Sequence, residues 1–124
     1  MLKLFEGRLN ETIEELKNAQ DALCNLDPDY IIVPPSSHSP AVQYLRDCAY
    51  VSLCDYREQN KLKPDNETYR KALLEVELQQ NADYQQARKL EIATTTTFRE
   101  LTHRIDLLKE HLQNLRILLS IGGT

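Results

Sequence analysis

Three histidines and a group of serines are the side chains of this sequence whose types suggest catalysis. Ser36 and Ser37 stand beside His38, which combines a hydroxyl nucleophile with a base, but neighbours in sequence rarely have the geometry of a catalytic triad. No glycine-rich turn accompanies them to supply an oxyanion hole. His103 and His111 are eight residues apart, whereas a zinc-binding pair on a helix is spaced i, i+4. We therefore expect no catalytic residue and no metal site, and we interpret the last two histidines as solvated.

Cysteines and glycines give no sign of a cofactor either. Cys24, Cys48 and Cys54 form no CxxC pair, and their odd number argues against a secreted disulfide framework. We expect them to be buried thiols, because free cysteine behaves as a small apolar residue. The only adjacent glycines stand at positions 122 and 123, so a phosphate-binding loop is missing. The sequence predicts a protein that is not an enzyme and has neither a cofactor nor an evident small-molecule substrate.

Charge limits the nucleic acids that this chain could bind. It has 15 Lys and Arg residues against 19 Asp and Glu, a net charge of −4. Nucleic-acid modules usually show a basic excess or a basic stripe. A local basic face remains open near the middle of the chain, where Tyr69 and Tyr84 could stack bases or could instead belong to the core. The candidate residues for nucleic-acid contacts are Lys61, Lys63, Arg70 and Lys71.

Helices are the elements expected to position these side chains. Many Leu, Glu, Gln, Lys and Arg residues, with only three Gly and no Trp, favour helix over sheet. We expect one all-α domain over residues 1–124, a bundle or hairpin of three or four helices that oligomerises. The expected helices lie at about 2–26, 40–59, 66–80 and 83–120, and a proline-rich loop lies at about 27–40.

Three segments need closer interpretation. Residues 30–33, Tyr-Ile-Ile-Val between prolines, either pack as a strap across the helices or are offered to a partner. Apolar and aromatic residues wrap more than one face of the second helix, so we expect it to be the most buried helix or to have two different neighbours. Four threonines at 94–97 lower helix propensity, but we expect the last helix to continue through them.

The last helix carries a coiled-coil seam. Its apolar residues recur at alternating spacings of four and three, which indicates packing against another helix. Basic residues occupy both heptad positions that flank the seam, e and g. Two copies of this helix would therefore oppose like charges whether they pair parallel or antiparallel. A simple two-stranded homodimer is therefore disfavoured. The residues expected to mediate helix packing or oligomerisation are Phe98, Leu101, Ile105, Leu108, Leu112, Leu115 and Leu119, preceded by Thr94.

Three partners for this seam remain open. The simplest is intramolecular packing against the acidic first helix or against the second and third helices. Another is a higher oligomer, which is favoured by apolar residues off the seam, namely Leu107, Ile117, Leu118 and Ile121. The last is a foreign helix or strand with acidic flanks.

No segment of the sequence indicates a membrane. The first residues, MLKLFEGRLNE, contain no apolar run of signal-peptide length, and no stretch approaches the roughly 18 consecutive apolar residues that a membrane span needs. We expect a cytoplasmic protein that has no membrane partner.

One family resemblance extends over roughly residues 44–119. It rests on an aromatic-rich segment YLRDCAYVSLCDY, a charged segment YRKALLEVELQQ, and a long terminal helix that begins ADYQQARKLEIATTTTFRE. This pattern resembles the UvsY-like recombination mediators of tailed phages, small helical oligomers that help load a recombinase onto single-stranded DNA. The resemblance implies that the terminal helix assembles the oligomer and that the four basic residues named above touch the DNA backbone.

Two functions are therefore expected from the sequence. The first is a non-enzymatic helical assembly protein that acts as a recombination mediator, with single-stranded DNA and a recombinase as partners. The alternative is an adaptor or inhibitor from a mobile element, which holds another protein through the acidic first helix or residues 30–33 and binds no nucleic acid.

Overall fold

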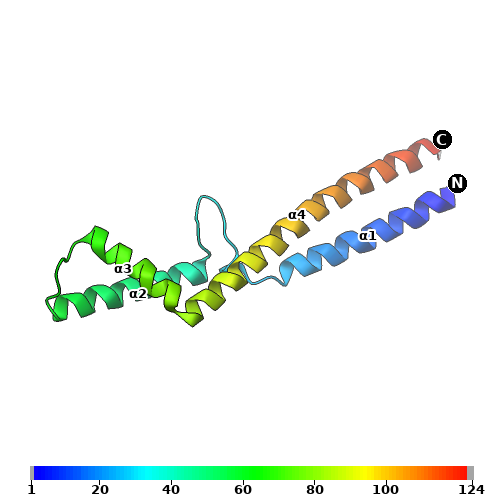
Figure 1. Cartoon of the computed structure of the whole chain (residues 1–124). Coiled ribbons are helices and arrows are strands. Elements are labelled where there is room, and N and C mark those ends of the chain that lie inside the picture. Colours follow the sequence, from blue (N-terminus) through cyan, green and yellow to red (C-terminus); the bar gives the residue numbers. More distant parts are fainter. Residues whose placement is uncertain (1, 123–124) are drawn as a thin grey trace. The chain divides into compact units, whose positions relative to one another are not determined.

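The protein is described by a computed structural model that covers residues 2–122, and this part of the chain is all-α (Figure 1). The described residues contain no strand. The prediction of an all-α fold with a long C-terminal helix is confirmed. The elements are α1 (Leu2–Cys24), the short 3-10 helix η1 (Pro28–Tyr30), α2 (Pro40–Gln59), α3 (Glu67–Gln80) and α4 (Ala82–Gly122).

Side-chain caps explain where these helices begin. Ser39, Asn66 and Asn81 precede α2, α3 and α4, and each side-chain oxygen accepts a hydrogen bond from the backbone N–H three residues later, at 3.4, 2.9 and 3.0 Å. Such caps satisfy an amide that would otherwise lack a partner at the helix start. Pro40 occupies the first turn of α2, where its missing N–H costs nothing. Asn81 thus separates α3 from α4.

Helix α4 has 41 residues and runs without interruption through the four threonines at 94–97. At about 1.5 Å per residue it is roughly 60 Å long. Contacts divide the chain at this point into two compact units, where we expected a single domain. We call Met1–Leu26 with Thr96–Thr124 the terminal unit, and Asp27–Thr95 the central unit.

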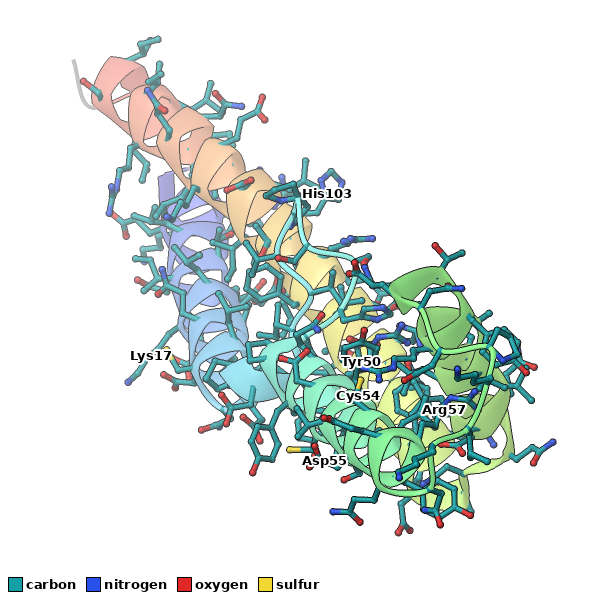
Figure 2. The ribbon with its side chains drawn as sticks, turned by 90° about the vertical axis from the view of Figure 1, so that its left-hand side faces the viewer. Lys17, Tyr50, Cys54, Asp55, Arg57 and His103 are labelled. Atoms are coloured by element: carbon teal, nitrogen blue, oxygen red, sulfur yellow. The ribbon has the colours of Figure 1, made fainter. Side chains whose placement is uncertain are left out.

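In the terminal unit, α1 lies antiparallel to the second half of α4 (Figures 1 and 2). The buried stripe of α1 follows the same alternation of four and three that the α4 seam shows. It includes Thr12, which is 5% exposed and donates to the carbonyl of Arg8, rather than the neighbouring Ile13, which is 41% exposed. In this stripe Thr12 and Ala19 are buried, Phe5, Leu9, Leu16 and Leu23 are half-buried, and the half-buried Leu26 follows just after the helix end.

In the central unit, the core forms where α2, α3 and the start of α4 meet. It consists of Val42, Leu53, Leu74, Leu78, Tyr84 and Ala87. Helix α2 contributes only one side to this core. Of the two expectations for α2, that it is the most buried helix is wrong, whereas that it has two different neighbours is confirmed, because α3 and the start of α4 both pack against it. Tyr44, Val51 and Tyr56 are instead 68%, 59% and 60% exposed.

The three cysteines also differ from expectation. Cys24 and Cys48 are exposed and Cys54 is half-buried, so the prediction of buried thiols is wrong. Each lies on an amphipathic helix, and a small side chain gives little indication of which side of such a helix it occupies.

Candidate functional site

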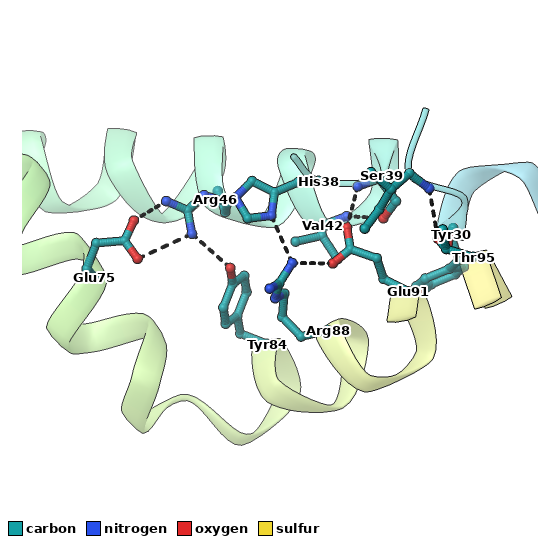
Figure 3. A network of polar contacts seen from close by, with 11 residues as sticks. Tyr30, His38, Ser39, Val42, Arg46, Glu75, Tyr84, Arg88, Glu91 and Thr95 are labelled. Carbon is teal, nitrogen blue, oxygen red and sulfur yellow. Dashed lines mark hydrogen bonds and ion pairs between the residues drawn. The ribbon is translucent and has the colours of Figure 1, made fainter. Parts of the chain in front are cut away.

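A buried polar network in the central unit attaches the proline-rich loop to α4 (Figure 3). Its centre is Glu91, whose side chain is fully buried. One carboxylate oxygen accepts a hydrogen bond from the backbone N–H of Ser39, and the other lies 2.6 Å from Arg88 Nη1. Arg88 Nη1 also donates to His38 Nδ1 at 3.1 Å. The buried carboxylate is thus matched by one cation and one backbone donor, as a buried charge requires.

The surroundings of His38 favour its neutral form. Burial lowers the pKa of His38 below its usual value of 6.5, and the nearby Arg46 and Arg88 cations lower it further, partly offset by Glu91 and Glu75. Since Arg88 can only donate, the neutral ring carries its proton on Nε2. Because the pKa of His38 is lower in the folded chain, the unfolded chain binds this proton at a higher pH than the folded chain does as the pH falls. The stability contributed by this group is therefore complete above pH 6.5 and declines as the pH falls below that value.

A second anchor holds the start of the same loop. The backbone N–H of Ile32 donates to Thr95 Oγ1 at 2.9 Å, and this hydroxyl is 3.4 Å from the carbonyl of Tyr30. Ile31 is buried, whereas Val33 is exposed. Of the two alternatives for residues 30–33, the structure shows the strap, packed against α4 within the central unit.

Arg46 links three helices of the central unit. Its guanidinium forms an ion pair with Glu75 of α3 and donates to the hydroxyl of Tyr84 of α4 at 2.8 Å. It lies 6.0 Å from the centroid of the Tyr84 ring. The side chain of Arg46 is mostly buried, so these bonds replace its contact with water.

These polar groups position the backbone and do not form a nucleophile and base. The hydroxyl of Ser39 caps α2, and the ring of His38 meets Arg88 rather than a serine. His103 and His111 are exposed on α4. Within residues 2–122, no group of three or more His, Cys, Asp or Glu side chains could hold a metal ion.

The four residues expected to touch nucleic acid lie in or just after the turn between α2 and α3, and acids neutralise two of them. Arg70 forms a bidentate ion pair with Asp65, with N to O distances of 2.5 and 2.6 Å. Lys71 Nζ is 2.9 Å from Glu67. Hydrogen bonds from these cations hold the pKa of both carboxyl groups below the usual range. Lys61 and Lys63 are exposed.

Arg57 organises this turn, and we did not anticipate it from the sequence. Its side chain is buried, donates to the carbonyl of Pro64, and lies 3.7 Å from Asp65. The guanidinium covers the ring of Tyr69 at 4.9 Å from the centroid. Tyr84 is buried in the core. Neither tyrosine therefore presents two free faces for stacking a base.

The seam residues form the inner side of α4 in the terminal unit. Ile105, Leu112 and Leu115 are buried, and the other predicted members, Phe98, Leu101, Leu108 and Leu119, are half-buried. Arg104 beside the seam lies 3.7 Å from Glu15 of α1. The acidic α1 thus supplies opposite charge where a second copy of α4 would supply like charge.

Large apolar residues also lie on α4 outside the seam. At about 100° per residue, Leu107 and Ile117 lie on the side facing away from the seam and Leu118 lies at the edge of that side, with the polar residues Glu110 and Asn114 between them along the helix. The three apolar residues are 52%, 50% and 46% exposed. We call these three residues the α4 outer face. A hollow of about 470 Å³ lined by Leu101, His103, Arg104 and Leu107 continues this surface.

Comparisons with protein-family models, with curated proteins and with solved structures found no match to this chain. In the described part of the chain, no helix is both long enough and apolar enough to cross a membrane. Function must therefore be argued from the surfaces described above.

Proposed function

We propose that this chain is a non-enzymatic assembly protein that forms a homo-oligomer through the α4 outer face. The observation that supports this proposal is the presence of large exposed apolar residues on α4 outside the seam. Helix α1 covers the seam side, and the outer face retains three large apolar residues that are about half exposed. Large apolar residues that stay exposed on a helix which already has one neighbour are typical of a surface that contacts a second neighbour.

Further copies of the chain are the partner that best fits this surface. The seam side already has its partner within the chain, so association needs no rearrangement of the terminal unit. Repulsion between two seams is reduced in such an oligomer, because α1 occupies the seam side and its Glu15 lies 3.7 Å from Arg104. Self-association through an apolar helix face is a common route to helical oligomers.

Light scattering coupled to size exclusion tests this assembly. We expect the unaltered chain to run as an oligomer, and Leu118→Lys to shift it toward the monomer mass, because a lysine charge cannot be desolvated cheaply in an apolar interface. Leu90→Lys is the matched control, since Leu90 has the same 46% exposure but lies on α4 in the central unit. A monomeric unaltered chain, or equal loss of mass in both variants, contradicts the proposal.

A recombination mediator that binds single-stranded DNA and a recombinase is the second candidate. The observation that favours it is the exposure of Lys61 and Lys63 in the turn between α2 and α3, where the structure records no ion pair for either within residues 2–122. Two cations on one turn can contact a phosphate backbone. An adaptor from a mobile element would need neither residue.

A salt-dependent titration with a fluorescent single-stranded oligonucleotide separates these functions. If Lys61 and Lys63 contact phosphates, replacing both with Gln lowers the slope of log affinity against log salt by about 1.4 in magnitude, roughly 0.7 per contact. Lys71→Gln serves as the control, because Glu67 already neutralises that charge. Absence of binding at low salt removes the mediator function and leaves the assembly proposal intact.

A further inference from the structure

Helix α2 of the central unit has an exposed side that we call the α2 outer face. Tyr44, Cys48, Val51 and Asp55 follow one another at spacings of four, three and four, which places them on one line along the helix. All four are exposed. The neighbouring Cys48 thiol raises the pKa of the Tyr44 phenol.

The basic and the acidic residues of α2 lie on different sides of the helix. Both of its arginines turn inward, Arg46 to Glu75 and Tyr84, and Arg57 to the turn before α3. All three of its acids, Asp47, Asp55 and Glu58, are exposed, and the structure pairs none of them with a cation within the described residues. Figure 2 shows Asp55 and Arg57 on different sides of the helix. The outer face therefore combines an apolar line with uncompensated negative charge.

Hollows on both sides of Tyr44 give this face a shape that can receive side chains. One of about 380 Å³ is lined by Tyr44, Asp47, Cys48, Val51 and Ser52. The other, of about 420 Å³, is lined by Asp29, Tyr30, Pro40, Ala41, Tyr44 and Leu45. Each hollow has an aspartate at its rim, so an apolar side chain that enters lies close to an acid.

We propose that the α2 outer face binds an amphipathic helix of another protein whose apolar stripe is flanked by lysine or arginine. Apolar residues spaced four and three match the stripe of a partner helix, and charges beside such a stripe select the partner. Phosphate-rich ligands are repelled by the acids. Pairing of two α2 faces would oppose Asp47 and Asp55 to the same acids of the other copy, which disfavours a second copy of this chain.

Two synthetic peptides test this charge preference. Both are amphipathic helices with leucine at i, i+3, i+4 and i+7; one has lysine and the other has glutamate beside the stripe. By fluorescence anisotropy at low salt, we expect the lysine peptide to bind at least about tenfold more tightly, with an affinity that falls as salt rises. Equal binding of the two peptides overturns the proposal.

The cysteines report where the lysine peptide binds. Cys48 and Cys24 are both exposed. Cys48 lies in the α2 outer face, whereas Cys24 belongs to α1. We expect saturating peptide to slow alkylation of Cys48 by iodoacetamide by about tenfold and to leave Cys24 unchanged, as read by mass spectrometry. Protection of neither or both cysteines overturns the proposal. If Cys48 becomes protected when the protein concentration is raised without peptide, the α2 outer face binds a second copy of the chain. That result also overturns the proposal.

Charge reversal supplies the matched variants. Asp47→Lys combined with Asp55→Lys is expected to weaken lysine-peptide binding by about tenfold or more and to strengthen glutamate-peptide binding. Glu77→Lys combined with Asp83→Lys changes the net charge equally at exposed positions on α3 and α4. If both double variants weaken binding equally, the attraction is a general effect of net charge and the α2 site is refuted. Assembly through the α4 outer face is measured separately by mass, so either proposal can fail alone.

Discussion

Leu115→Ala is expected to lower the free energy of unfolding of the terminal unit by about 2–5 kcal/mol. Leu115 is 3% exposed on the seam side of α4, and truncation would remove apolar contacts and leave a cavity between two helices. Two helices form this unit, so few other contacts compensate. Urea denaturation followed by far-UV circular dichroism measures the change.

Leu107→Ala is the matched control for this prediction, since it makes the same chemical change on the same helix at a side chain that is 52% exposed. At protein concentrations too low for association, its effect is expected to stay within about 0.5 kcal/mol. Equal destabilisation by the two substitutions would show that the seam and the outer face do not differ in burial, which would contradict the packing of α4 described above.

Glu91→Ala is expected to destabilise the central unit by about 2–4 kcal/mol. The substitution removes the acceptor of the Ser39 amide and the partner of Arg88, and Ser39 is fully buried, so its N–H cannot turn to water instead. Arg88 is about one-third exposed and can be partly rehydrated, which limits the loss. Urea denaturation gives the stability, and native-state hydrogen exchange reports the Ser39 amide directly.

Glu91→Gln separates the two roles of this carboxylate. The amide oxygen can still accept from Ser39 while the charge opposite Arg88 is lost, so we expect a cost of about 1 kcal/mol and retained protection of the Ser39 amide. In Glu91→Ala the protection of this amide, and of the Ile32 amide bound to Thr95, should fall. Unchanged exchange at Ser39 in the alanine variant would refute the anchoring role of Glu91.

Local sequence signals sufficed for the helices. Ser39 and Asn66 act over three residues, so their capping is visible in the sequence, and the bounds of α2 and α3 agree with expectation to within a residue. The seam was visible because its alternation of four and three persists from Thr94 to Leu119 in one helix. The burial of Thr12 in α1 is not visible in the sequence, since a threonine counts as polar although its hydroxyl can bond to its own helix and leave its methyl group to pack.

Several polar contacts could not be foreseen, because they join residues distant in sequence or depend on the conformation of one turn. Glu91 looks like an ordinary surface residue, and only the fold brings it to Ser39, 52 residues away. The ion pair of Arg70 with Asp65 needs the particular turn before α3, which Arg57 holds. For α2, apolar residues were counted all around the helix, but sequence does not show which side a neighbouring helix covers.

The division of the chain into two units has a consequence for folding. The central unit is one continuous stretch, Asp27–Thr95, whereas the terminal unit joins both ends of the chain across that stretch. Bringing such distant segments together costs loop-closure entropy unless the intervening chain is already compact. Folding of the central unit first would shorten the effective loop, so we expect the inserted unit to form before α1 pairs with α4.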